Sequence, residues 1–65
     1  MNLKSIKSIK EGDFIYEPLW YGEVTKVYKS GVLVLYSWEN WAGTFCKKEF
    51  ITFDELLNDN YKLIN

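Results

Sequence analysis

The chain has no histidine and no arginine, and it contains a single cysteine and a single proline among 65 residues. Without histidine, the commonest metal ligand and the usual acid or base at neutral pH are both missing. Neither a glycine-rich phosphate loop nor a metal-ligand spacing occurs. Cys46 lies beside Phe45 in a predicted strand, which favours a buried structural thiol over a nucleophile. We therefore expect no enzyme, no metal site and no cofactor.

The absence of arginine also bears on nucleic-acid recognition. All eight basic residues are lysines, and with nine acidic residues they give a net charge of −1. Arginine makes most bidentate contacts to guanine and phosphate, so sequence-specific reading of DNA is not expected. No apolar run reaches the ~18 residues that span a bilayer, and no signal peptide is seen. With one cysteine, these features predict a cytoplasmic protein without a membrane segment.

The chain is rich in apolar residues, which make up 48% of it, and aromatic residues account for 18%. A chain of this length makes one domain, residues 1–65, and such a domain buries only about 60% of its unfolded surface. Its expected stability is roughly 3–10 kcal/mol. Bulky aromatic rings compensate for the short chain, but a domain this small cannot hide all twelve, so several should be exposed.

The apolar pattern centres on residues 22–38. Residues 22–28 are rich in β-branched and aromatic types, and residues 32–36 form an apolar run typical of a strand buried on both faces. We therefore expect Leu33 and Leu35 in the core, where truncation to alanine costs ~2–5 kcal/mol. Ser30 and Gly31 predict a tight turn between the strands, because glycine accepts positive φ. A bulge near Lys26 would restore the interrupted alternation of the first strand.

Aromatic loops are predicted on both sides of this hairpin. Further strands are expected at 14–16, 44–51 and 61–64. Pro18 cannot donate to a strand ladder, which predicts a loop over 17–21 with Trp20 and Tyr21 at its tip. Residues 38–43 predict a second loop, which carries Trp38 and Trp41.

The two ends of the chain carry helical signals of different quality. Thr52 and Glu55 fit a capping box, and Ile51 and Leu56 stand at the positions of a hydrophobic staple, so a short helix is predicted over 53–58. Residues 1–11 repeat a lysine at every third position and fit either a helical turn or an extended segment. We favour an extended lead-in that lays its isoleucines on the core and keeps its lysines in solvent.

This order of elements resembles SH3-like barrels, the broad class that includes SH3, Tudor and KOW-type domains. The resemblance is carried by residues 12–15, 22–24, 31–34 and 53–57, and it implies an all-β, five-stranded SH3-like barrel with one short helix before the last strand. An OB-type barrel is the alternative, although its helix usually lies between strands three and four. The acidic, tyrosine-rich loop of peptide-binding SH3 domains is not found, so a proline-rich ligand is not implied.

In SH3-like barrels the first and third inter-strand loops lie near one another. The resemblance therefore implies an exposed aromatic patch. Tryptophan and tyrosine dominate binding hot spots, but in a small chain some of these rings, above all Trp38 and Tyr36, equally fit a core role. The carboxylates beside the first loop, Glu17 and Glu23, are expected only to solvate it. The predicted partner-binding patch comprises Trp20, Tyr21, Trp38, Trp41, Tyr36 and Tyr16.

Three functions fit such a patch. The first is a non-catalytic module that binds a protein partner, through a peptide, a folded surface or a methyl-ammonium group. A lysine-, asparagine- and isoleucine-rich composition suggests a phage or mobile-element protein that blocks a host enzyme or a defence protein. The second is single-stranded nucleic-acid binding by aromatic stacking, with phosphates held by Lys26, Lys29, Lys47 and Lys48. The third is a structural homodimer, formed through the patch or an edge strand.

Overall fold

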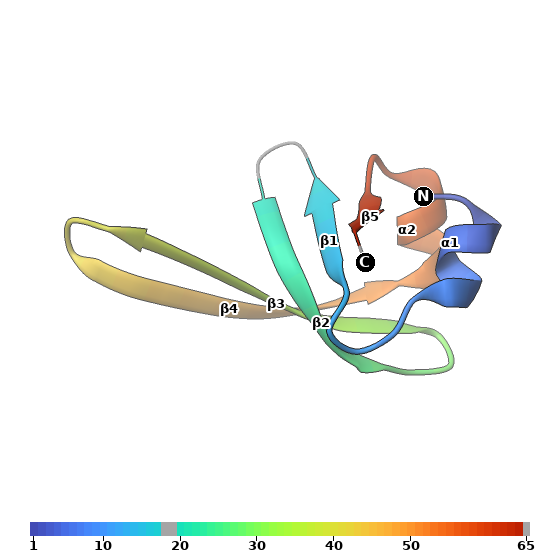
Figure 1. The fold of residues 1–65 in the computed structure, drawn as a ribbon, viewed down its shortest axis with the longest axis horizontal. Helices are drawn as coiled ribbons and strands as arrows, with labels where there is room; N and C mark the ends of the chain where they lie inside the picture. Colours follow the sequence, from blue (N-terminus) through green and yellow to red (C-terminus); the bar gives the residue numbers. More distant parts are fainter. Residues whose placement is uncertain (18–19, 65) are drawn as a thin grey trace.

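The fold is described from a computed structural model covering residues 1–17 and 20–64. In these residues, five strands form one antiparallel sheet in the order β4-β3-β2-β1-β5 (Figure 1). This confirms a mostly β fold with a short helix before the last strand. Pro18, which predicted the first loop, lies outside the described residues. The elements are α1 (Leu3–Ser8), β1 (Phe14–Glu17), β2 (Trp20–Val27), β3 (Gly31–Asn40), β4 (Gly43–Thr52), α2 (Phe53–Asn58) and β5 (Lys62–Ile64).

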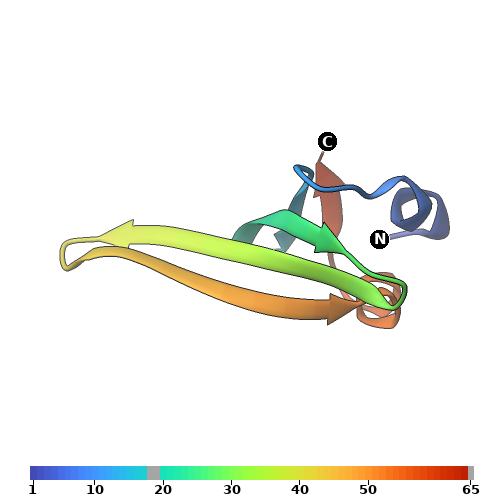
Figure 2. The same cartoon turned by 90° about the horizontal axis from the view of Figure 1, so that it is seen from below.

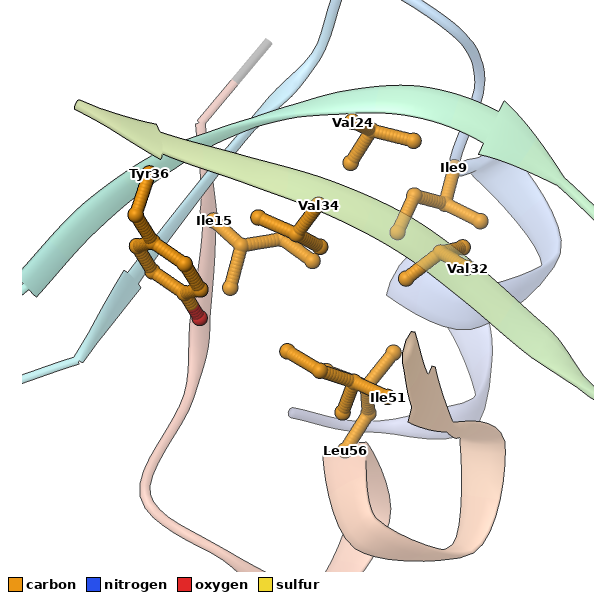
Figure 3. Close-up of a cluster of buried hydrophobic side chains, with 8 residues drawn as sticks. All are labelled: Ile9, Ile15, Val24, Val32, Val34, Tyr36, Ile51 and Leu56. Atoms are coloured by element: carbon orange, nitrogen blue, oxygen red, sulfur yellow. The ribbon is translucent and has the colours of Figure 1, made fainter. Parts of the chain in front are cut away.

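The core lies on one face of the sheet, which we call the core face. Alternate residues of β3 are buried there, and Val32 and Val34 are completely inaccessible. Leu33 and Leu35 point to the opposite face and are only half-buried, so the predicted burial of both faces of β3 is wrong. The reason is that both helices lie against the core face alone. The buried apolar cluster consists of Ile9, Ile15, Val24, Val32, Val34, Tyr36, Ile51 and Leu56 (Figure 3).

The hairpin of β2 and β3 contains the predicted bulge. The pairing register shifts between Val24 and Lys26, and the Thr25 hydroxyl donates a hydrogen bond to the Leu33 carbonyl at 3.1 Å. Gly31, however, does not adopt positive φ, so the predicted reason for this glycine is wrong. It is buried as the first residue of β3, where a Cβ would collide with the Ile51 carbonyl oxygen. Close approach of β4 therefore requires glycine at this position.

The helix α2 begins as its sequence predicts. The Glu55 amide donates to the Thr52 hydroxyl at 3.1 Å, and the Thr52 amide donates to the Glu55 carboxylate at 3.2 Å, which completes the capping box. The two staple residues, Ile51 and Leu56, are both fully buried. Local side-chain chemistry and core packing therefore agree on where this helix starts.

The N-terminal segment is a helix rather than the extended lead-in we predicted. The Asn2 side chain accepts a hydrogen bond from the Ser5 amide at 2.8 Å and caps α1. The predicted docking of the apolar residues holds, because Ile9 is buried and Ile6 packs against the core. Asp13 is also buried, and its carboxylate accepts a hydrogen bond from the Lys10 amide at 3.0 Å. That contact fixes the turn between α1 and β1.

The longest hairpin, β3 with β4, projects from the rest of the molecule (Figures 1 and 2). The last residue of β3 that pairs with β2 is Tyr36, whereas pairing with β4 continues to Asn40 and Gly43. We call residues 37–46 the hairpin arm. The arm makes the molecule elongated, 39 × 21 × 18 Å, with a radius of gyration of 11.9 Å. A globular chain of this length is expected to have about 11 Å.

Candidate functional site

The sheet brings four strands together where the core face leaves the body and continues onto the hairpin arm. Directly paired residues of an antiparallel sheet project from the same face. Three cross-strand pairs therefore follow the buried cluster outward along the core face. These pairs are Glu17 with Trp20, Tyr36 with Lys47, and Trp38 with Phe45.

The aromatic rings at this junction pack in contact. The Trp20 ring lies 5.5 Å from the Trp38 ring at an interplanar angle of 67° and 6.5 Å from the Tyr36 ring at 74°. Phe45 stacks on Trp38 with 5.8 Å between ring centroids. Edge-to-face and offset-stacked contacts of this kind hold rings in defined orientations. The cluster is therefore a preorganised surface of rings.

The rings line a pocket of about 270 Å³. Tyr36 is buried, with 4% exposure, whereas Trp20 and Trp38 remain 46% and 36% exposed. Two carboxylates and one ammonium group share the lining, which leaves one excess negative charge. The Lys47 ammonium lies 3.6 Å from the Glu49 carboxylate on the same strand. The aromatic pocket, as we call it, comprises Glu17, Trp20, Tyr36, Trp38, Lys47 and Glu49.

Two tyrosines at this end of the core, Tyr36 in the pocket lining and Tyr61, have raised pKa values. Burial raises the pKa of Tyr36 above its usual range, and the negative charges of Glu17 and Glu49 add to the shift. Burial, followed by the charge of Glu17, raises the pKa of Tyr61 to about 12. Both effects disfavour an added negative charge at this end of the core. The charges of Glu17 and Glu49 therefore disfavour an anionic group here, whereas burial penalises a charge of either sign.

Gly22 provides the space for this arrangement. It lies on the core face of β2, between Ile15 of β1 and Tyr36 of β3. A Cβ at this position would lie 2.5 Å from a Val34 methyl carbon and 2.9 Å from the Tyr36 ring. The missing side chain lets the Tyr36 ring lie across β2 and form one wall of the pocket.

The predicted patch is only partly assembled. Trp20, Tyr36 and Trp38 come together, but Trp20 and Trp38 lie in strands and not in loops as we predicted. Tyr21 is also in a strand, and because side chains alternate along β2 it points to the opposite face, where it stacks on Phe14 at 5.0 Å. Tyr16 pairs with Tyr21 and shares that face.

Trp41 stands apart from the other rings. It lies in the two-residue turn at the tip of the hairpin arm and is 98% exposed. The Asn40 side chain accepts a hydrogen bond from the Ala42 amide at 2.8 Å and shapes this turn, and Gly43 follows with a φ of 132°. The structure does not bring Trp41 to the aromatic pocket.

The four candidate lysines are divided between different surfaces. Lys26 and Lys48 project from the face opposite the core, which we call the open face. Lys47 belongs to the aromatic pocket, and Lys29 lies in the connection between β2 and β3. A single phosphate-binding row of all four lysines is therefore not formed.

Cys46 is exposed, which contradicts the buried thiol that we predicted. The residue lies mid-strand, but β4 is an edge strand and Cys46 belongs to the hairpin arm, beyond the cover of the helices. Its surroundings provide no histidine partner, since the chain contains none.

Three residues of the site were missed or misjudged from the sequence. Glu17 lines the pocket instead of merely solvating a loop, and Glu49 and Phe45 approach it from β4. The feature of the sequence that could have revealed Phe45 and Glu49 is the short turn between Asn40 and Gly43, because it fixes the register of the β3–β4 hairpin. Counting back from that turn in steps of two places residues 45, 47 and 49 opposite 38, 36 and 34.

Comparison with protein-family models, with curated proteins and with solved structures finds no match to the chain. Within residues 1–17 and 20–64, no helix is long and apolar enough to cross a membrane. The same residues contain no group of three or more cysteine and acidic side chains placed to hold a metal ion.

Proposed function

We propose that this protein is a small non-catalytic binding module that captures a basic side chain of a protein partner in the aromatic pocket. The observation that carries the proposal is the composition of that pocket, in which two tryptophans, a tyrosine, two glutamates and one lysine surround about 270 Å³ and leave one excess negative charge. Ring faces attract cations through their quadrupole, by about 0.5–2 kcal/mol depending on desolvation. The carboxylates of the lining would add a charge-assisted hydrogen bond to an ammonium or guanidinium group.

The surroundings of the pocket support a protein as the source of the cation. Phe45 and Trp41 lie exposed on the hairpin arm, and Trp20 and Trp38 add exposed ring surface next to the body. Exposed aromatic groups of this kind mark interaction surfaces in small proteins, since tryptophan and tyrosine give large contact area with few rotatable bonds. A partner that inserts a basic residue would cover these rings as well. The predicted blocking of a host enzyme or defence protein stays a prediction, as does the resemblance to SH3-like barrels.

Small probes test the pocket without knowledge of the partner. We would titrate the protein with Nα-acetyl-arginine amide and Nα-acetyl-lysine amide and follow the indole N–H signals by NMR. Nα-acetyl-norleucine amide is the matched uncharged control. We expect saturable shifts of Trp20 and Trp38 with the basic probes, with Kd values on the order of 1 mM, or about −4 kcal/mol. Trp41 serves as the internal reference, because it lies outside the pocket.

Two variants separate the pocket from general electrostatics. Trp38→Ala removes a pocket wall and should abolish the response, whereas Trp41→Ala should leave it unchanged. Glu49→Gln removes a carboxylate of the pocket lining and should weaken the response to the basic probes. Glu39→Gln removes a carboxylate outside the lining and is its charge control. Equal shifts with norleucine amide, or no shift with either basic probe, would contradict the proposed function.

A further inference from the structure

The open face of the sheet carries a second array of exposed aromatic rings. Tyr16 and Tyr21 are paired across β1 and β2 and are 40% and 50% exposed, and Phe14 stacks against Tyr21 at 5.0 Å. On the far side of the sheet, Phe50 of β4 is 44% exposed and meets Tyr28 edge-to-face at 5.9 Å. These rings lie on the face that neither described helix covers, opposite the aromatic pocket.

Lysines alternate with these rings on the same face. Lys62 of β5 pairs with Tyr16, Lys48 of β4 pairs with Leu35, and Lys26 of β2 pairs with Leu33, which itself pairs with Phe50. The carboxylate among them is Glu23, paired with Phe14 and Leu35. Three ammonium groups and one carboxylate leave an excess of two positive charges. Glu39 shares this face towards the tip of the hairpin arm and reduces the excess over the whole face to one positive charge.

This charge is opposite in sign to that of the aromatic pocket, although the whole chain carries a net charge of −1. The two faces of the sheet are therefore complementary to different ligands. An anionic ligand with flat apolar surfaces that stack on the rings would complement the open face. Neighbouring strands lie about 4.8 Å apart, so a ligand that crosses several of them needs the length of a few nucleotides.

We infer that the open face binds a short stretch of single-stranded nucleic acid. Bases stack on Tyr16, Tyr21 and Phe50, and the phosphates between them are neutralised by Lys26, Lys48 and Lys62. Stacking on aromatic side chains tolerates any base and contributes about 1–3 kcal/mol per base. Neutralisation of phosphates by lysine needs no bidentate fork, so the absence of arginine restricts sequence reading but not this mode of binding. The inference does not depend on the aromatic pocket and extends beyond the proposed function.

Fluorescence anisotropy of a labelled oligothymidylate and of an oligouridylate, each of about 12 nucleotides, tests the inference over a range of salt concentrations. The full chain should bind both, and log Kd should change with log salt with a slope of about 2, which three phosphate contacts predict for a single strand. Tyr21→Ala and Phe50→Ala should each weaken binding about tenfold, since each removes one stacking platform. Circular dichroism of each variant verifies the fold.

A matched pair of triple variants tests the location of the site. Lys26→Glu, Lys48→Glu and Lys62→Glu together should abolish binding, whereas Lys4→Glu, Lys7→Glu and Lys10→Glu, with the same change in net charge, should weaken it less than about threefold at moderate salt. Equal losses in the two triple variants would overturn the inference, because binding would then depend on net charge alone. No binding by the wild-type chain at low salt would overturn it as well. Loss of binding in Trp38→Ala would instead place the oligonucleotide in the aromatic pocket and contradict the open-face site.

Discussion

At the scale of single residues, the ionisation of two tyrosines predicts how stability depends on pH. Burial and the nearby Glu17 charge raise the pKa of Tyr61 to about 12 and that of Tyr36 further. In the unfolded chain both should ionise near their usual value of 10.0. A pKa that is raised on folding contributes stability that is complete below pH 10 and is lost as the pH rises towards the folded value.

We therefore expect the melting temperature to fall as the pH increases from about 10 to 12. Thermal unfolding followed by circular dichroism at a series of pH values measures this loss. Tyr61→Phe should make the decline shallower, because a phenylalanine does not ionise in either state. Tyr28→Phe, at an exposed tyrosine, is the matched control for the loss of one hydroxyl group. If the Tyr61→Phe variant shows the same profile as the wild type, the ionisation of Tyr61 does not cause the loss of stability above pH 10.

Gly22 shows how one missing side chain supports the site. Gly22→Ala places a methyl group 2.5 Å from a Val34 carbon and 2.9 Å from the Tyr36 ring. We expect a loss of about 1–3 kcal/mol, typical of overpacking, together with a weaker response of the aromatic pocket to basic probes. Chemical denaturation measures the first effect, and the NMR titration measures the second. Glu23→Ala, at the neighbouring exposed position, should change stability by less than about 0.5 kcal/mol.

At the scale of elements, predictions from the sequence succeeded where short-range chemistry decides. The capping box of Thr52 and Glu55 needs only four consecutive residues, and the structure forms both of its hydrogen bonds. The bulge near Lys26 was also predictable, because one extra residue in a strand is the simplest way to restore an interrupted alternation. For α1, in contrast, the three-residue repeat was compatible with both a helical turn and an extended segment. The structure forms the helix, with the Asn2 side chain as its N-cap.

The aromatic segments were harder to predict, since tryptophan and tyrosine next to a proline or glycine suggested loops. In the structure Trp20 and Tyr21 are consecutive strand residues, and they therefore face opposite sides of the sheet. One predicted patch thus becomes two surfaces. Side chains alternate between the two faces along a strand, so a shift of one residue in the strand would exchange the faces. No local signal for Trp20 alone could have revealed which side it faces.

The capping box allows a quantitative test of α2. Thr52→Ala removes the hydroxyl that accepts from the Glu55 amide at 3.1 Å, and we expect a loss of about 1 kcal/mol. Urea denaturation measures the change. Thr44→Ala, the same substitution at an exposed position of the hairpin arm, is the matched control and should cost only a few tenths of a kcal/mol. Equal losses at the two positions would show that the cap contributes nothing specific.

The alternation of β3 gives a second test at this scale. Ile15 of β1 is fully buried in the core, and Ile15→Ala should lower the free energy of unfolding by about 2–5 kcal/mol, a large part of the ~3–10 kcal/mol expected for the whole domain. Leu33 is half-buried on the open face, so Leu33→Ala should cost distinctly less. Denaturation midpoints of the two variants provide the comparison. A greater loss for Leu33→Ala would show that both faces of β3 belong to the core.

At the scale of the whole molecule, one thin sheet presents two surfaces of opposite character. The core face ends in the acidic aromatic pocket, and the open face carries lysines between exposed rings. Their charges are separated by the thickness of a single sheet. A ligand on one face touches none of the side chains that bind on the other, and at moderate salt its charge acts only weakly across the sheet.

This arrangement predicts that the two ligands bind together with little coupling. The affinity for the oligothymidylate, measured in the presence of saturating Nα-acetyl-arginine amide, should differ less than about twofold from the affinity in matched sodium chloride, which corrects for the added ionic strength. By thermodynamic linkage, the oligonucleotide must change the affinity for the arginine probe by the same small factor. A tenfold weakening beyond the salt control would mean that the ligands compete for one site. Retention of both affinities in the ternary mixture would instead show that the two faces bind a basic group and a single strand of nucleic acid at the same time.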